Sequence, residues 1–258
     1  MGRPLSLLSG CLIVVTTAGC AAREEQQPVM KGGLSAVRAA ECRWATLPIR
    51  IDGRIDDIAW DKAQVLDDFV VFWQKRKAKT ATRARLLWND RYLFFMAEME
   101  DTDLFADVKE PNGITWENDV FELFFKPADA KLAYYEFQVN AANTPLELFL
   151  PSRGSGGYRR FAQASRLGME SAVRLQGTLN KWDDRDKGWT VEGRIPWSAF
   201  KATGGRPKPG DKWRFALCRY DYSKDFDRPE LSSTAPLTQP DFHRYEDYGV
   251  LTFVGPAR

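Results

Sequence analysis

The sequence predicts an all-β fold, in which two antiparallel sheets pack into a sandwich and short helical turns join some of the strands. Short runs of alternating apolar and polar residues recur along the chain with turn-forming residues between them, and long amphipathic helical patterns are nearly absent. The 258 residues allow one large domain or two small ones, and an all-β domain of this size is ordinary. A two-sheet sandwich is the simplest architecture that fits these observations.

The expected elements can be read in order along the chain. A short strand at 49–51 precedes the Asp52-Gly53 turn, and Ile58-Ala59-Trp60 suggests a short helical turn. Two apolar runs flank Asn89-Asp90-Arg91, a pattern typical of a β-hairpin. Cleaner alternation predicts later strands over 173–179, 189–195, 213–218 and 249–254.

Two irregular segments interrupt these strands. Residues 151–157 contain three glycines, and residues 223–240 contain three prolines. Loops at the ends of a sandwich often carry binding residues. We therefore expect both segments at the rim of a functional site.

The most informative stretches are 116–125 and 134–140, which combine aromatic and polar residues. Read as a strand, the second places Tyr135, Phe137 and Val139 on one face. The other face then carries Glu136, Gln138 and Asn140. Hydrogen-bonding side chains beside an aromatic such as Trp116 are what a sugar-binding face needs, because sugars present both hydroxyl groups and an apolar ring face.

Composition excludes one class of partner. Lys and Arg number 37 against 35 Asp and Glu, a net charge of +2, whereas nucleic-acid binding calls for a concentrated basic field. Aromatic residues make up 13% of the chain, and nine are tryptophans. Most of these should pack in the core, which leaves some for a functional surface.

The N-terminus reads as a targeting segment. Arg3 precedes an apolar run from Leu5 to Val15 that is too short for a permanent membrane span, and Thr17-Ala18-Gly19-Cys20 follows. This pattern resembles a bacterial lipoprotein signal, with residues 1–19 as signal peptide and Cys20 as the lipidated residue. The alternative is a secretory signal cut after Ala18, Ala21 or Ala22. Polar residues 20–40 then form a flexible tether, and the protein is expected in the bacterial cell envelope, anchored to a membrane by lipid.

Two further cysteines, Cys42 and Cys218, lie in the predicted domain. An oxidising compartment would allow them to form a disulfide, which would close a long loop. Two partly buried thiols are the competing interpretation. No Cys-x-x-Cys spacing suggests a bound metal.

Six landmarks occur in order. They are the segments 51–60, 87–93, 116–122, 137–140 and 188–196, followed by Phe242-His243 before Tyr248-Gly249. Together they are similar to the family 9 carbohydrate-binding modules and their relatives. The resemblance spans about residues 45–254, and we take 41–256 as the domain.

The resemblance implies an immunoglobulin-like β-sandwich that binds sugars between two stacked aromatics. It makes Trp116 the first stacking aromatic and Glu122 a carboxylate that accepts sugar hydroxyls, with Asn140 as a further match. Three positions depart from the pattern. Gln138 replaces a basic residue, Cys218 or its neighbour Arg219 replaces a polar residue, and Phe242 lies near the second stacking aromatic. We expect sugar contacts from Trp116, Glu122, Gln138, Asn140, Arg219 and Phe242.

Catalysis is not expected. Glycoside hydrolysis needs two carboxylates that face each other across the scissile bond, and Glu117, Asp119 and Glu122 lie together on one strand instead. His243 is the single histidine, which leaves no Ser-His-Asp set and favours a structural role.

Two cofactors have candidate ligands in the sequence. Haem-binding relatives of the same sandwich superfamily use axial Met, His or Lys ligands, and Met96, Met99, Met169 and His243 are available here. Structural Ca²⁺, which the resemblance allows, would use oxygen ligands from Asp52, Asp56, Asp57, Asp101 and Asp103. No EF-hand spacing supports a calcium site, so solvated turn residues are the simpler interpretation of these acids.

The sequence therefore predicts a lipid-anchored, non-catalytic domain that binds an oligosaccharide or polysaccharide. It would serve as an accessory to carbohydrate breakdown or uptake, beside a separate glycoside hydrolase or a transporter. The alternatives are a haem-binding redox domain and a lipoprotein with a structural or protein-binding role.

Overall fold

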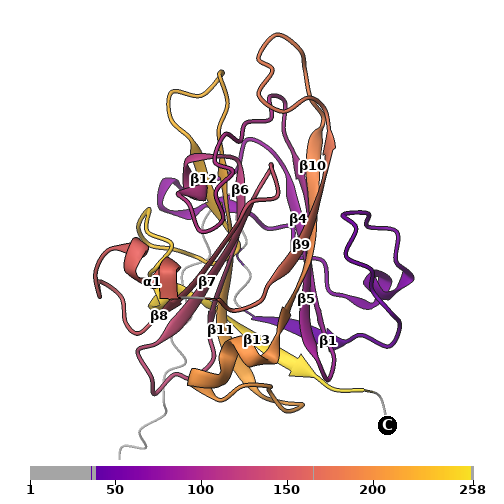
Figure 1. Ribbon diagram of the computed structural model, residues 1–258, viewed down its shortest axis with the longest axis vertical. Helices are drawn as coiled ribbons and strands as arrows, with labels where there is room; N and C mark the ends of the chain where they lie inside the picture. Colours follow the sequence, from indigo (N-terminus) through magenta and orange to yellow (C-terminus); the bar gives the residue numbers. More distant parts are fainter. Residues whose placement is uncertain (1–35, 37–38, 165, 257–258) are drawn as a thin grey trace, which may run out of the picture. The chain divides into compact units, whose positions relative to one another are not determined.

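The computed structural model describes residues 36, 39–164 and 166–256 (Figure 1). The predicted signal peptide, the lipidation site Cys20 and nearly all of the predicted tether lie outside the described residues. The first strand begins at Ala39, so the last two residues of the expected tether belong to the folded domain. Among the described residues, no helix has the length and apolar character needed to cross a membrane.

Strands dominate the described chain. They are β1 Ala39–Trp44, β2 Val70–Val71, β3 Arg76–Lys77, β4 Thr82–Trp88, β5 Tyr92–Glu100, β6 Val120–Lys126, β7 Tyr134–Asn140, β8 Pro145–Leu150, β9 Glu170–Gln176, β10 Gly188–Pro196, β11 Lys212–Asp221, β12 Glu230–Ser233 and β13 Gly249–Val254. One α-helix, α1, covers Tyr158–Ala164, and the 3₁₀ helices are η1 Ile58–Lys62, η2 Phe72–Gln74, η3 Thr115–Glu117, η4 Trp197–Thr203 and η5 Tyr245–Asp247.

The strands form two facing layers (Figure 1). One layer holds β8, β7, β6 and β11, and the other holds β4, β5, β10 and β9. The path β11-β13-β1-β4 connects the layers through hydrogen-bonded neighbours. This arrangement confirms the predicted all-β sandwich.

The sheet is mixed, in contrast to the purely antiparallel arrangement expected. Strand β1 pairs in parallel with both β13 and β4. Parallel neighbours cannot be joined by a tight hairpin and need a long connection. The chain meets this requirement because 37 residues, 45–81, separate β1 from β4.

The main core lies between the layers. Tyr135, Phe137 and Val139 of β7 belong to it, as the alternation predicted, and they face buried residues of β4, β5 and β10. Most tryptophans also pack inside, with Trp60, Trp88 and Trp189 each about 1% exposed. Trp182, at 44% exposure, is the clearest exception.

A second hydrophobic cluster lies on the outer face of the β6–β7–β8–β11 layer. It includes Phe124 of β6, Tyr134 of β7, Leu148 of β8 and Cys218 of β11, with α1 and residues 235–248 packed over them. Figure 1 shows α1 beside β8. This outer face carries the candidate site described below.

Several local predictions were confirmed, although no strand forms at 49–51 and β9 covers 170–176 where 173–179 was expected. The hairpin is the pair β4–β5, the helical turn is η1, and the last strand has the predicted bounds 249–254. The segment 223–240 contains the unpredicted strand β12, whose sequence Glu-Leu-Ser-Ser has little apolar alternation. Strand β12 forms because it pairs with β11, the strand that precedes it in the chain, across the connection 222–229.

Of the two interpretations of Cys42 and Cys218, the disulfide is wrong, because both residues are buried free thiols. Cys42 packs in the core between the layers, whereas Cys218 belongs to the outer cluster and lies 3.5 Å from Ser233 Oγ. The two side chains thus occupy separate hydrophobic clusters. Burial raises the pKa of both thiols.

Candidate functional site

A cavity of about 440 Å³ opens on the outer face of the β6–β7–β8 layer. This volume lies in the range of small-molecule sites. It is lined by Trp116, Glu122, Phe124, Tyr134, Glu136, Gln138, Leu148, Leu150, Ser152, Arg153, Gly154, Ser155, Gly156, Tyr158, Tyr220, Pro240, Asp241, Phe242 and His243. Four of the six predicted sugar contacts are among them, namely Trp116, Glu122, Gln138 and Phe242.

Neighbouring strands supply the polar part of this lining. Glu122 of β6 lies opposite Gln138 of β7, and Glu136 lies opposite Phe124. Because side chains alternate along a strand, Glu122, Glu136 and Gln138 share the outer face. All three are almost fully buried, with exposed fractions of 1%, 3% and 1%.

Hydrogen bonds hold part of this polar group. Gln138 Nε2 donates to Glu136 Oε1 at 2.5 Å, and Thr115 Oγ1 donates to Gln138 Oε1 at 2.6 Å. Glu122 Oε1 and Glu136 Oε2, in contrast, are buried and have no hydrogen-bond partner in the protein. Buried polar atoms normally have partners, so two such atoms in one cavity mark places for ligand groups.

The electrostatics of the pair follow from burial. Loss of hydration raises the pKa of the Glu122 carboxyl well above its usual value, and the nearby Glu136 charge adds to this. Burial also raises the pKa of Glu136, while His243 and the Gln138 hydrogen bond oppose it. Both carboxyls are therefore acids that hold their protons more tightly than an exposed glutamate.

An aromatic wall stands beside the carboxyls. Trp116, in η3, is half-buried, and its ring meets Tyr158 of α1 edge to face with centroids 4.7 Å apart. The Trp116 carbonyl accepts a hydrogen bond from Tyr222 Oη at 2.9 Å, which fixes this segment. Phe242 also lines the cavity, but it is 4% exposed and packs against Tyr220, which leaves too little surface for a sugar ring to stack on.

The rim comes from two loops. Residues 152–156 line the cavity, as predicted for the glycine-bearing segment, whereas Pro240 is the one lining residue from the segment 223–240. The Nδ1 atom of His243 lies 2.9 Å from Tyr134 Oη and 3.9 Å from Glu136 Oε2. His243 is therefore part of the site, although the sequence favoured a structural role for it.

Asn140 does not reach the cavity, contrary to expectation. Its Nδ2 donates to the Val108 carbonyl and to Asn118 Oδ1, and its Oδ1 accepts from the backbone N–H groups of Ala142 and Thr144. These bonds occupy the side chain completely. Asn140 shapes the turn after β7 and is a structural residue in this fold.

Arg219 also lies away from the cavity, on the inner side of β11. Its Nη2 donates to Asp101 Oδ2 at 3.0 Å and to the Glu100 carbonyl at 2.8 Å, and its Nη1 donates to Thr82 Oγ1 at 3.2 Å. A second ion pair links Nη2 to Asp221 Oδ1 at 3.4 Å. Alternation along β11 explains the correction, because Cys218 and Arg219 must face opposite sides.

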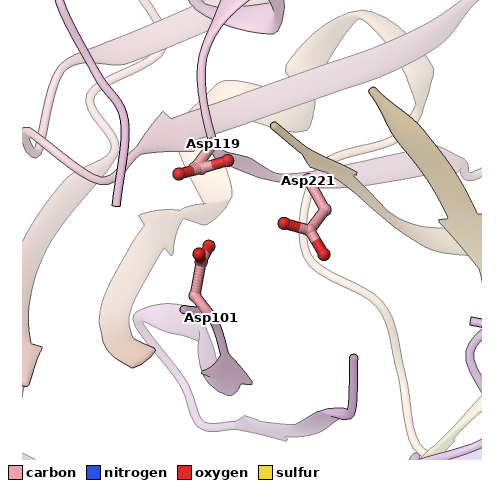
Figure 2. A group of neighbouring side chains, drawn as sticks. All are labelled: Asp101, Asp119 and Asp221. Atoms are coloured by element: carbon pink, nitrogen blue, oxygen red, sulfur yellow. The ribbon is translucent and has the colours of Figure 1, made fainter. Parts of the chain in front are cut away.

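Three buried carboxylates lie together here, and two of them pair with Arg219. Figure 2 shows Asp101, Asp119 and Asp221 pointing toward one another, and their oxygens lie within 4.8 Å of each other. Asp119 accepts two backbone N–H bonds, of 2.6 and 2.7 Å. Burial raises the pKa of Asp101 to about 6, although Arg219 acts to lower it.

The acidic group does not fit the calcium site that was considered. Arg219 already pairs with two of its three carboxylates and supplies the positive charge that they need. Asp101 is the one candidate ligand that belongs to the group; Asp52, Asp56, Asp57 and Asp103 lie outside it. Asp101 and Asp103 are nevertheless buried, so solvated turn acids were a wrong interpretation of these two.

The residues named for haem ligation are scattered. Met96 and Met99 are buried in two different hydrophobic clusters, and Met169 lies at the edge of the main core. His243 belongs to the cavity on the outer face of the other layer. Nothing in these positions brings a methionine to His243.

Sequence reasoning left Glu136, Tyr158 and His243 out of the predicted site. Glu136 could have been found, because alternation in 134–140 already placed it beside Gln138. Tyr158 and His243 reach the cavity from segments distant in sequence, and no local pattern marks them.

Comparison with known proteins decides the family. A model described as "Carbohydrate family 9 binding domain-like" matches residues 51–256, most of the chain. The chain belongs to this family. It is a family of carbohydrate-binding domains, so membership assigns binding and not catalysis to this chain.

Named relatives are consistent with this assignment. Endo-1,4-beta-xylanase A of Thermotoga maritima is 28% identical over 176 residues, 66% of this chain but 14% of the xylanase. The protein of the same name from Thermotoga neapolitana is 29% identical over 226 residues, 86% of this chain and 18% of that protein. The chain thus spans less than a fifth of the length of these relatives.

Solved structures share the fold. A family 9 carbohydrate-binding module from Caldicellulosiruptor kristjanssonii, in complex with cellotriose, has a TM-score of 0.58 and 17% identity over 85% of this chain and 95% of its own. A putative carbohydrate-binding protein from Bacteroides uniformis has a TM-score of 0.65 and 17% identity over 84% of this chain and 99% of its own. At this level of identity the comparison establishes the β-sandwich architecture.

Proposed function

We propose that this protein binds a carbohydrate non-catalytically in the cavity on the outer face of β6, β7 and β8. The observation that carries the proposal is the combination of the Trp116 ring with the buried, unpartnered oxygens of Glu122 and Glu136. A pyranose ring has an apolar face that can lie on an aromatic and hydroxyl groups that can donate to carboxylates. The cavity offers both kinds of contact side by side.

The expected ligand is a short glucan or xylan segment or its terminal unit. Related structures hold cellotriose in one case and glucose in another, and other relatives are xylanases. A cavity of about 440 Å³ is suited to one or two sugar units. We expect modest affinity, roughly millimolar to micromolar, or about −4 to −8 kcal/mol.

The wider role is that of an accessory at the bacterial cell envelope. The predicted lipoprotein signal and Cys20 would anchor the domain to a membrane, and the tether would carry it away from the surface. There it would hold oligosaccharide or polysaccharide for a separate glycoside hydrolase or for uptake. The likeness to parts of xylanases supports this role.

Calorimetric titration with glucose, cellobiose and xylobiose, using protein that lacks residues 1–20, tests the proposal. Trp116→Ala and Glu122→Ala should each weaken binding at least about tenfold, since each removes a contact worth about 1.4 kcal/mol or more. Trp182→Ala is the matched control, because Trp182 is 44% exposed and does not line the cavity. Unchanged affinity in both cavity variants would show that the sugar binds elsewhere.

A further inference from the structure

Two carboxylate oxygens of the cavity lack the partners that buried glutamates have elsewhere in the described chain. Glu230 Oε2, which also has no hydrogen-bond partner, forms an ion pair with Arg76 Nη1 at 2.5 Å. Glu192 accepts from Trp60 Nε1 at 2.8 Å and from the backbone of Asp52 and Gly53 at 3.2 and 3.3 Å. Glu122 Oε1 and Glu136 Oε2 have no such donors, although they are equally buried. A molecule that enters the cavity can supply the missing donors.

The cavity also lacks a free positive charge close to this pair. Arg153 is the single Arg or Lys among the described residues that line it, and Arg153 Nη1 is bonded to Glu246 Oε2 at 2.6 Å. His243 lies 3.9 Å from Glu136 and contributes charge only when protonated. Asp241, a further acid at the rim, accepts the His243 backbone N–H at 2.9 Å. The protein thus leaves two buried acids without a cationic side chain bonded to them.

A protonated amine supplies what the cavity lacks better than a hydroxyl group does. It brings a positive charge and three N–H donors, whereas a hydroxyl brings one donor and no charge. Charge-assisted hydrogen bonds are about twice as strong as neutral ones, and burial increases the difference.

A metal ion is a poorer match for the same place. A metal site needs several acidic, His or Cys side chains whose ligand atoms lie close together. In the described part of the chain, one group of three or more such side chains meets this condition, and it consists of Asp101, Asp119 and Asp221. Glu122, Glu136 and His243 do not form such a group. An organic ammonium needs only two such acceptors, because each N–H donor bonds one carboxylate oxygen.

We propose that the cavity selects amino sugars with a free, protonated amine, and that Glu122 and Glu136 bind the ammonium group while Trp116 lies against the ring. This inference rests on the proposed carbohydrate binding and replaces the neutral glucan or xylan ligand expected above with a charged sugar. Glucosamine and its oligomers are the simplest members of that class. The ammonium charge lowers the pKa of both carboxyls in the complex and so opposes the effect of burial.

Calorimetric titration of the protein with glucosamine, glucose and N-acetylglucosamine at pH 7 tests the inference. These sugars share the ring and differ in the group at carbon 2, which is charged only in glucosamine. We expect glucosamine to bind at least about tenfold more tightly than either neutral sugar, with little loss in 0.5 M salt because the pair is buried. The glucosamine dimer should show the same preference over cellobiose and N,N′-diacetylchitobiose.

Two variants assign the preference to the carboxyl pair. Glu122→Gln and Glu136→Gln keep the size of the side chain and remove its charge, so each should reduce the ratio of glucosamine to glucose affinity severalfold. Asp183→Asn is the control, because the Asp183 side chain is 80% exposed and does not line the cavity. The wild-type comparison of charged and neutral sugars stands even where a variant fails to fold.

The outcomes separate the two proposals. Equal or tighter binding of glucose or N-acetylglucosamine would overturn the amino-sugar inference and leave carbohydrate binding in place. A glucosamine preference that survives both glutamate variants would overturn the assignment to this pair. Failure of every sugar to bind, amino sugars included, would contradict the proposed function itself.

Discussion

Buried carboxyl groups govern both the site and the response of this protein to pH. Burial is the largest cause that raises the pKa of Glu122 and Glu136 in the cavity and of Asp101, Asp119 and Asp221 around Arg219. A carboxyl whose pKa is higher in the folded than in the unfolded state binds more protons when folded. The stabilisation that it provides is therefore complete at pH values below its pKa in the unfolded state. This stabilisation is lost as the pH rises through its pKa in the folded state.

Stability should accordingly fall between pH 5 and pH 8. Unfolded Glu and Asp titrate near pH 4, and each unit by which a folded pKa exceeds that value costs about 1.4 kcal/mol at high pH. In Glu246 and Asp247, burial acts to raise the pKa, but hydrogen bonds outweigh it and lower the pKa. These two groups therefore make the protein less stable as the pH falls, but only below about pH 4. Urea denaturation at both pH values measures the fall.

Glu122→Gln is the variant that tests this origin. It removes a titrating group that is 1% exposed, so the loss of unfolding free energy from pH 5 to pH 8 should be smaller than in the wild type. Asp183→Asn, which changes a largely exposed acid, should leave the loss unaltered. An identical pH dependence in Glu122→Gln would mean that this carboxyl is not perturbed as described.

Arg219 should matter for stability and not for ligand binding. Arg219→Met would leave Asp101 and Asp221 buried without their cation, and breaking a buried ion pair from one side typically costs about 3–5 kcal/mol. Urea denaturation should show this loss, while sugar affinity per folded molecule stays constant because Arg219 does not line the cavity. The exposed Arg54→Met serves as control. Weaker sugar binding by folded Arg219→Met would revive its predicted contact role.

At the scale of elements, the loop 151–157 forms part of the rim and depends on glycine conformation. Gly154 has φ of +71°, a region that costs other residues energy, and its Cβ position is open space. Gly154→Ala should therefore shift the loop away from its binding conformation and weaken sugar binding by up to about fivefold, for a cost of about 1 kcal/mol. Titration measures the shift, and thermal unfolding should change little.

Gly205→Ala is a closely matched control for this change. Gly205 has φ of +75°, also with open space around its Cβ position, but it lies in the turn after η4 and does not line the cavity. It should cost similar conformational energy without affecting affinity. Equal effects of the two variants on binding would argue that the loop 151–157 has no specific role.

Elements with local patterns were predictable from sequence, and contacts between distant elements were not. Alternation placed Phe137 in the core and Gln138 in the cavity, because a strand has one repeat whatever it packs against. Asn140 lies on the same face as Gln138, but it is the last residue of β7. Its Oδ1 there accepts hydrogen bonds from backbone N–H groups of the following turn. His243 enters the site by packing on Phe124, a contact between segments more than 100 residues apart.

At the scale of the whole molecule, a weak site gains from attachment to a surface. One cavity with millimolar to micromolar affinity would release a single sugar quickly, whereas many anchored copies can hold one polysaccharide at several points. Effective concentration then raises the overall affinity by about 10²–10⁴ without any new contact. The proposed lipid anchor and the proposed binding cavity are thus parts of one function.

The anchor can be tested through Cys20. In a bacterial host, the wild type should incorporate labelled palmitate and sediment with membranes, and Cys20→Ala should lose the label and leave the membrane fraction, since several acyl chains bury many CH₂ groups at about 0.8 kcal/mol each. Cys42→Ala, which changes a buried thiol of the folded domain, should keep the label. If the signal is instead cut after Ala18, Ala21 or Ala22, mass spectrometry will find an unmodified N-terminus and wild-type protein free of the membrane. Binding would then act through dispersed molecules without the gain from multiple anchored copies.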